Sequence, residues 1–429
     1  MDKLNLKEEF IIDESIKSYE FHEYQPEQID LNRYNTEYRF KVNQQDLYLD
    51  ISESYLQFTG QVLRKDNNVE IVLKPEDQLT MINNGLMYLF SSIQYSLSGK
   101  EIEDIRNPGE TTTIMGYLSY SGDFEKTEGL NQLWYRDGST DFKTKTSFNV
   151  LHKHIVVNST PNGTFSFLIP LKHILGFCKS YNKVLYGFKH ELILNRKSND
   201  HYAIIRTPGD PDTTEGGFIK LSKFSWYIPH VKPNLAKETQ ILNDIKNKVN
   251  YKVAYKRFSS EKQTVPGGKD WSWRLATSTL PDKPRFIIIG FQEVKNEKID
   301  EWDNSKFNHG NLKNVYVNLD SRRYPAIDYD LDFRKNDFCR MFKEAISFNK
   351  KCFGITDTVN MTPFDYKDYY PIYVVDVSNQ SDEIKGGVTD ITIKMSFAKT
   401  PQNLEATAII VTDRIAMFSS DGSKFAVIE

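Results

Sequence analysis

The stretch that indicates the fold reads Leu89-Phe90-Ser91-Ser92-Ile93-Gln94-Tyr95-Ser96-Leu97-Ser98-Gly99-Lys100-Glu101-Ile102-Glu103. Within it, Ile93, Tyr95 and Leu97 alternate with polar residues, which predicts a half-buried β-strand. Ser98 and Gly99, which are typical of turns, follow that strand. The same combination of a short alternating run and a polar turn recurs along the chain, and it favours an all-β protein.

The composition excludes several classes of protein. The chain has 429 residues, and its 55 Lys+Arg against 58 Asp+Glu give a formal net charge of -3, which excludes a strongly basic nucleic-acid-coating protein. No stretch approaches the roughly 20 consecutive apolar residues that a membrane helix needs. Residues 1–10 show no pattern for secretion or organelle import. We therefore expect the protein to act in the cytosol, in the nucleus or in a particle assembled there.

Short period-2 runs, broken by Asn, Asp, Gly and Pro, continue through both halves of the chain. The 27 Phe and 24 Tyr residues also favour strands over helices. The predicted strands cover residues 37–42, 47–51, 55–63, 93–97, 164–169, 190–194 and 219–228 in the first half, and 251–255, 272–277, 286–291, 315–319, 372–377, 391–397 and 407–411 in the second.

Three helices interrupt this pattern. Apolar residues group within 114–118, and others follow the spacing i, i+3, i+4, i+7 and i+8 from Phe338 to Ile346. Asn234 is typical of a helix N-cap and begins the third helix. The sequence thus predicts an acidic N-terminal arm over 1–34, a first domain over 35–231, a linker helix over 232–249 and a second domain over 250–429.

The two halves resemble each other in order, which indicates an internal duplication. Residues 93–97 and their turn match 315–319 and the turn that follows, and each match is followed by a predicted helix. Further along, 167–169 pairs with 372–374 and 191–194 with 390–393. Each half offers about eight strands over roughly 200 residues, which suits a sandwich or jelly roll of two antiparallel sheets. A parallel α/β enzyme would need a helix after nearly every strand.

Three segments carry a resemblance to a known family: Leu89 through Glu103, Pro161 through Leu171 with Leu175-Gly176-Phe177, and Lys306 through Leu319 continuing to Tyr324-Pro325. They look like a virus-derived family found widely in invertebrate genomes, which resembles the double jelly-roll major capsid proteins of Polinton (Maverick) elements and adintoviruses. The likeness runs from about residue 35 to the end, and it includes the linker helix and Asp413-Arg414.

The resemblance implies an all-β fold of two tandem eight-stranded antiparallel jelly rolls, a double jelly roll, with short inserted helices. It also implies a homotrimer that forms pseudo-hexagonal capsomers of an icosahedral shell around double-stranded DNA. The expected partners are neighbouring capsomers, penton proteins and minor capsid proteins, and the expected location is the virion, assembled in the host cytoplasm or nucleus. The acidic arm does not suit contact with DNA phosphates, so we expect no sequence-specific nucleic-acid binding.

We predict no catalytic, cofactor-binding or metal-binding residues, and therefore no enzyme. Gly267-Gly268-Lys269 lacks the spacing of a phosphate-binding loop, and His190-Glu191 lacks the second histidine of a zinc motif, so it is read as sheet surface. His152 and His154 would share one face of a strand but have no third ligand. Asp328-x-Asp330-x-Asp332 lacks the glycine and the glutamate of a calcium loop, and Asp210-x-Asp212 is read as a turn.

The remaining candidates are also read as structural. Cys178, Cys339 and Cys352 are expected to be reduced, and the last two to be buried beside a helix rather than nucleophilic. The pairs Trp134-Tyr135 and Trp271-x-Trp273 are expected in a core or interface.

The alternative is a β-sandwich that binds or hydrolyses carbohydrate with exposed aromatics and paired acids. A capsid relative domesticated in an animal genome is a second alternative. Segments 122–152, 206–217 and 292–310 are expected to be long loops that reach outward or contact other subunits.

Overall fold

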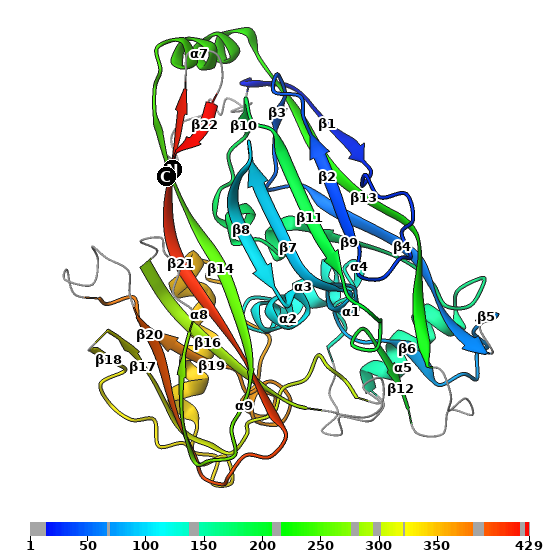
Figure 1. Cartoon of the computed structure of the whole chain (residues 1–429), viewed down its shortest axis with the longest axis vertical. Coiled ribbons are helices and arrows are strands. Elements are labelled where there is room, and N and C mark those ends of the chain that lie inside the picture. The colour runs from blue at the N-terminus through cyan, green and yellow to red at the C-terminus, as the bar shows by residue number, and fades with distance from the viewer. Residues whose placement is uncertain are drawn as a thin grey trace, which may run out of the picture.

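Two pairs of antiparallel β-sheets form the framework of the chain, one pair in each half (Figure 1). The computed structural model describes residues 14–66, 69–136, 146–207, 216–275, 283–294, 302–320, 322–380, 390–420 and 425–428. The all-β class predicted from the sequence is confirmed. No helix in these ranges combines the length and apolarity that crossing a membrane requires.

The first unit has eight principal strands in two sheets, ordered β1-β13-β4-β9 and β2-β11-β7-β8. Their bounds are β1 (Ile16–Tyr24), β2 (Glu37–Val42), β4 (Tyr55–Asp66), β7 (Phe90–Leu97), β8 (Lys100–Arg106), β9 (Thr164–Pro170), β11 (His190–Arg196) and β13 (Gly217–Pro233). Three short strands extend the first sheet: β3 (Tyr48–Leu49), β5 (Val69–Val72) and β10 (Leu185–Tyr186). The sheets enclose an aromatic core in which the rings of Phe58 and Phe224 stack 4.5 Å apart.

The second unit has the same strand order, β14-β21-β16-β19 in one sheet and β15-β20-β17-β18 in the other. Its strands are β14 (Tyr251–Thr264), β15 (Asp270–Arg274), β16 (Lys283–Glu293), β17 (Leu312–Leu319), β18 (Arg322–Tyr324), β19 (Tyr373–Asp376), β20 (Ile391–Phe397) and β21 (Leu404–Ser420), with β22 (Phe425–Ile428) added beside β21. Phe291, Tyr373 and Phe397 pack edge to face between its sheets.

Numbering the principal strands of each unit from first to eighth gives the order 1-8-3-6 in one sheet and 2-7-4-5 in the other, for both units. Each unit is therefore an eight-stranded jelly roll, and the expected double jelly roll is confirmed. The segments matched in the sequence fall on equivalent strands: β7 with β17, β9 with β19 and β11 with β20. This agreement supports the predicted duplication.

The three predicted helices are confirmed. They are α2 (Pro108–Tyr117), α7 (Leu235–Lys246) and α8 (Cys339–Phe353). Asn234 caps α7 by accepting a hydrogen bond from the N–H of Lys237 at 2.8 Å, whereas Phe348 of α8 packs against Phe286 of β16. The other elements are short: α1 (Gly85–Tyr88), α3 (Gly122–Lys126), α4 (Glu128–Asn131), α5 (Thr146–His152), α6 (Gly176–Ser180), α9 (Pro363–Asp368), a π-helix (Lys153–Val157), a 3-10 turn (Leu171–His173) and the strand pair β6 (Leu79–Met81) and β12 (Ile204–Arg206).

Three expectations need correction. The arm predicted over 1–34 contains the first strand of the jelly roll, because β1 pairs with β13 from Ile16 to Tyr24. His152 and His154 lie on consecutive helical turns and not on a strand. The segment 122–152 contains the helices α3, α4 and α5, so it is not a plain loop. Asp210-x-Asp212 lies outside the described residues.

Candidate functional site: the junction between the two jelly rolls

The first strand of the second jelly roll, β14, lies against β8 and α6 of the first (Figure 1). At the centre of this contact, the buried Glu103 carboxylate of β8 accepts three backbone hydrogen bonds. Gly176 and Phe177 of α6 each donate at 3.0 Å, and Phe258 of β14 donates at 2.8 Å. One side chain thus connects a strand, a helix start and the other jelly roll.

Burial raises the pKa of the Glu103 carboxyl to about 7, against the three N–H donors and nearby Arg257, which favour the ionised form. The carboxylate is tolerated in the interior because three N–H groups donate hydrogen bonds to its oxygens. The same bonds give each of these buried N–H groups an acceptor. Its role here is to hold the junction, since no second titratable group bonds to it.

The two jelly rolls approach closely where α6 meets β14. A Cβ added at Gly176 would lie 2.5 Å from the backbone oxygen of Lys256, which no side-chain rearrangement relieves. The N–H of Lys256 is also bonded to the Ser180 hydroxyl at 3.2 Å. Glycine at position 176 is therefore needed for the close approach.

Further polar contacts cross the junction along the length of β14. The Tyr255 hydroxyl donates to the carbonyl of Ile102 at 3.3 Å, and the Ser260 hydroxyl donates to the carbonyl of Arg106. The Arg257 guanidinium pairs with Glu101 at 2.7 Å. These bonds join β14 to β8 by side chains, whereas the backbone of β14 pairs with β21.

An ion triad of one buried and two half-buried side chains lies at the far end of β14. Lys262 pairs with Glu110 of α2 at 3.0 Å and with Glu405 of β21 at 2.7 Å. Burial alone would raise the pKa of Glu110, but Lys262 and Lys197 outweigh burial and hold that pKa at about 2. Burial lowers the pKa of Lys262, yet Glu110 and Glu405 outweigh it and raise the pKa overall. Both partners are therefore charged at neutral pH.

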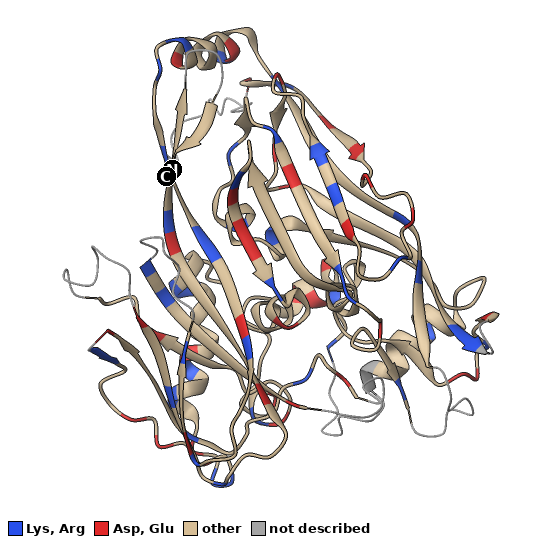
Figure 2. Cartoon of the chain, viewed as in Figure 1, with Lys and Arg blue, Asp and Glu red and all other residues tan. Residues whose placement is uncertain are grey.

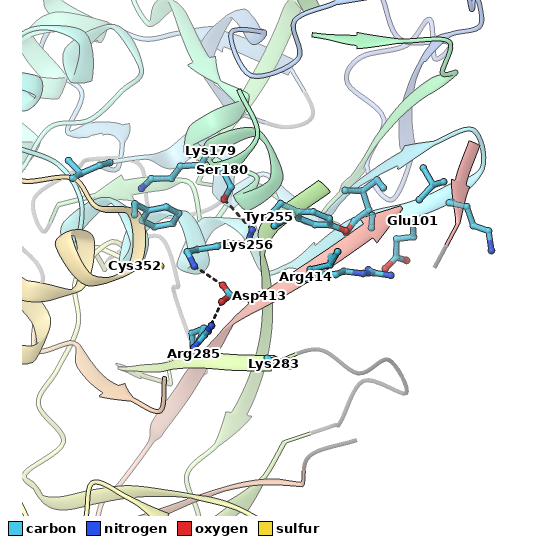
Figure 3. Close-up of a pocket in the computed structure, with 18 residues that line it drawn as sticks. Glu101, Lys179, Ser180, Tyr255, Lys256, Lys283, Arg285, Cys352, Asp413 and Arg414 are labelled. Carbon is cyan, nitrogen blue, oxygen red and sulfur yellow. Dashed lines mark hydrogen bonds and ion pairs between the residues drawn. The ribbon is translucent and has the colours of Figure 1, made fainter. Parts of the chain in front are cut away.

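A pocket of about 760 Å³ opens beside the junction and is lined by both jelly rolls (Figure 3). Its lining has six cations and two acids: Lys100, Lys179, Lys256, Lys283, Arg285 and Arg414, with Glu101 and Asp413. Asp413 pairs with Lys256 at 2.6 Å and with Arg285 at 2.5 Å. The excess of cations suits contact with acidic groups.

The pocket does not have the constellation that covalent catalysis needs. Burial raises the pKa of the Cys352 thiol to about 12, so the reactive thiolate is absent at neutral pH. Burial lowers the pKa of Lys179 to about 8, but its ammonium lies 4.0 Å from the Phe353 ring centroid and bonds to Ser119. Among the described residues, no group of three or more His, Cys, Asp or Glu side chains is placed to hold a metal ion.

Some candidate residues from the sequence lie elsewhere than expected. His190 was read as sheet surface but is buried and bonds through Nδ1 to the Tyr95 hydroxyl at 2.8 Å, and burial lowers its pKa to about 3. Cys339 is exposed, so the expectation that it is buried is wrong, whereas Cys178 and Cys352 are buried.

The aromatic candidates lie as predicted. Trp134, Tyr135, Trp271 and Trp273 are buried, and the last two stack with ring centroids 5.1 Å apart. Asp328 pairs with Arg323, and the Asp332 carboxylate accepts from the backbone N–H of Arg334 within its own turn.

Glu103 and Glu110, the central groups of the junction, were missed by sequence reasoning. The only available signal was that Glu103 shares its strand parity with the apolar Ile105 in the otherwise charged stretch Ile102-Glu103-Asp104-Ile105.

Comparisons with known proteins agree with the two-unit architecture. A family model described as a double jelly roll-like domain matches residues 79–416. The chain belongs to the double jelly roll-like domain family. No curated protein matches its sequence.

Solved structures share the double jelly roll over almost the whole chain. A Sputnik virophage structure aligns with a TM-score of 0.64 at 11% identity, covering 99% of this chain and 91% of that one. The mavirus major capsid protein aligns at 0.54 and 12% identity, covering 99% and 92%. The Faustovirus major capsid protein aligns at 0.57 and 9% identity, covering 94% and 90%. At these identities the likeness establishes a shared double jelly-roll fold.

Proposed function

We propose that this chain is a major capsid protein that assembles as a homotrimer, in which each trimer forms a pseudo-hexagonal capsomer. The observation that carries the proposal is the duplication: two jelly rolls of identical strand order lie side by side in one chain. Three such chains place six equivalent units around one axis. The fold is shared with the mavirus and Faustovirus major capsid proteins.

The proposal extends to the particle. The capsomers tile an icosahedral shell of a double-stranded DNA virus or virus-like element of the Polinton or adintovirus type. Neighbouring capsomers, penton proteins and minor capsid proteins are the partners, and the virion, assembled in the host cytoplasm or nucleus, is the location. The chain acts by association and not by catalysis.

A carbohydrate-binding or carbohydrate-hydrolysing sandwich is the alternative function. The tryptophans that suggested an aromatic platform for sugar, Trp271 and Trp273, are 7% and 3% exposed and cannot form one. The structure therefore favours the capsid proposal.

Light scattering of the purified chain, with negative-stain imaging of the same fraction, tests the proposal. A trimer of three 49.9 kDa chains, about 150 kDa, with hexagonal outlines in the images is the expected result. A monomer that persists across salt and pH would overturn it.

A further inference from the structure

The pocket beside the junction has an excess of positive charge, although the chain as a whole is slightly acidic. Its six cations and two acids give the lining a net charge of +4, whereas the whole chain has a net charge of -3. Both jelly rolls contribute cations, Lys100 and Lys179 from the first and Lys256, Lys283, Arg285 and Arg414 from the second. Figure 2 shows basic positions on β14, β16 and β21 close together at this place. Because like charges repel, this arrangement favours an anion in the pocket.

Three neighbouring strands place charged residues directly opposite one another here. Asp413 of β21 lies opposite Lys256 of β14 on one side and opposite Lys283 of β16 on the other. The register of β16 then shifts at Arg285, which has no residue opposite it. A bulge of this kind re-aims the extra side chain, and Arg285 pairs with Asp413. One carboxylate is therefore surrounded by three cations.

Lys179 of the first jelly roll adds a cation at the same place. Burial lowers its pKa to about 8, and the influence that opposes burial is the neighbouring Cys352 thiol and not a carboxylate. Lys179 and Lys256 both lower the pKa of that thiol, against the effect of burial, so the two ammonium groups face one region. Figure 3 shows the charged ends of Lys179, Lys256 and Arg285 on the side of the pocket where Cys352 lies. The two jelly rolls thus direct cations toward a common space.

We propose that this pocket binds a compact molecule with two or three phosphate groups, and that the bound molecule bridges the two jelly rolls. A phosphate group has a charge of about -1.5 to -2 near neutral pH, so two or three of them offset the net charge of the lining within a small volume. The Arg285 guanidinium matches phosphate oxygens in pairs, whereas Lys179 and Lys256 act as point charges.

The size of the pocket favours a small phosphate compound over a macromolecule. Its volume of about 760 Å³ lies within the range of about 300 to 1,000 Å³ typical of small-molecule sites. A peptide supplies one charge for each acidic residue and a nucleic acid one for each nucleotide, so either would need several residues in this volume. Tyr255, Phe353 and Ile355 form an apolar part of the lining, which suits an organic group attached to the phosphates. Inorganic polyphosphate and nucleoside triphosphates share the required chemistry.

The site belongs to a single chain, so the inference goes beyond the proposed function and does not depend on the homotrimer. Asp413 holds Lys256 and Arg285 through its two ion pairs, which orients these cations before a phosphate group arrives. A ligand that binds only the folded chain shifts the unfolding equilibrium toward that state. Bound phosphate is therefore expected to stabilise the junction.

Isothermal titration calorimetry of the full chain with inorganic tripolyphosphate tests the inference. One tripolyphosphate is expected to bind per chain, more weakly as salt is added, and to raise the melting temperature by several degrees. K179M removes a cation of the first jelly roll and is expected to raise the dissociation constant about tenfold or more. R285K keeps the charge but loses the paired geometry, so the constant should rise several-fold.

K183M is the matched control, because it changes the net charge as K179M does but removes an exposed lysine outside the lining. Its dissociation constant should equal that of the wild type. Thermal melting without ligand verifies that each variant folds, and R285K tests the inference even if K179M does not fold.

Parallel titrations with ATP distinguish the two sources of phosphate. Tighter binding of ATP than of tripolyphosphate would support a nucleotide that uses the apolar part of the lining, and equal or weaker binding would support inorganic polyphosphate. The inference is overturned if neither probe binds at low salt, or if K183M weakens binding as much as K179M. Tighter binding of polyglutamate or of a single-stranded oligonucleotide also overturns it, because the pocket would then serve a macromolecule. A wild-type chain that binds tripolyphosphate but stays monomeric would contradict the proposed homotrimer and support this inference.

Discussion

The carboxylate of Glu103, in the first jelly roll, accepts a hydrogen bond from the backbone N–H of Phe258, in the second, at 2.8 Å. The same carboxylate binds the first two amides of α6. A backbone N–H at a sheet edge usually faces water or another strand. Here a buried side chain takes the place of the neighbouring strand, so the two jelly rolls are joined without forming one continuous sheet.

Removing this carboxylate is expected to loosen the junction. E103A leaves three buried N–H groups without an acceptor, and each such group costs about 1–3 kcal/mol, so we expect the free energy of unfolding to fall by at least about 3 kcal/mol. Urea denaturation followed by circular dichroism measures this change. E101A is the matched control on the same strand. It removes a partly exposed ion pair with Arg257 and should lower the free energy of unfolding by less than about 1 kcal/mol. Equal effects of the two variants would contradict the role of Glu103.

The close approach at Gly176 gives a second prediction. G176A places a methyl group 2.5 Å from the Lys256 backbone oxygen, and overpacking of this kind typically costs about 1–3 kcal/mol. We expect the melting temperature to fall by several degrees. In G267A the added methyl group meets nothing within 4 Å, so that variant should melt as the wild type does, or slightly higher. If G176A had the same melting temperature as G267A, the two jelly rolls would be able to move apart at the junction without loss of stability.

Most of the fold is predictable from the sequence because the sandwich leaves one face of most strands buried. Strand β9 shows this, since Phe165, Phe167 and Ile169 are buried while Ser166 is exposed. The same regularity explains why the duplication is visible in the sequence, as equivalent strands keep the same inward positions.

Strand β1 is missed for the opposite reason. Seven of its nine residues are exposed and the other two are intermediate, so no hydrophobic alternation marks it. Its strand conformation comes from pairing with β13, whose residues lie about two hundred positions further along the chain. An edge strand of this kind can be identified only once its partner strand is known.

The central residues of the junction are missed because their burial is not local. Glu103 lies on a strand with alternating charges, where a carboxylate normally faces water. It is enclosed by α6 and β14, which are 73 and 155 residues away in the sequence. For His190, similarly, burial follows from Tyr95 on the neighbouring strand. Contacts between segments that are distant in the sequence therefore bury both Glu103 and His190.

The Glu110–Lys262 pair predicts how stability depends on acidity. The pKa of Glu110 is about 2 in the folded chain, below its ordinary value of 4.5. Its contribution to stability is therefore complete above pH 4.5 and is lost as the pH falls toward 2. We expect the free energy of unfolding of the wild type to exceed that of E110Q by about 3 kcal/mol at pH 7. This difference should shrink steadily as the pH falls from 4.5 to 2. Urea unfolding across that range measures it.

The partner lysine provides the control for this prediction. K262M leaves the Glu110 charge buried without its main partner, so it should be more destabilising at pH 7 than at pH 3. A difference between wild type and E110Q that does not change with pH would show that the pair contributes packing and not charge.

The three cysteines are expected to react at different rates. Cys339 is exposed, whereas Cys178 and Cys352 are buried, and burial raises the pKa of both buried thiols. Because the thiolate is the reactive form, a thiol-specific reagent at neutral pH should modify one site per native chain quickly, and all three only after urea is added. Mass spectrometry of digested peptides locates the sites, and C339S should abolish the fast phase. A fast reaction at Cys352 in the native chain would instead show that the junction beside the pocket opens on the timescale of the labelling, because that thiol is otherwise buried.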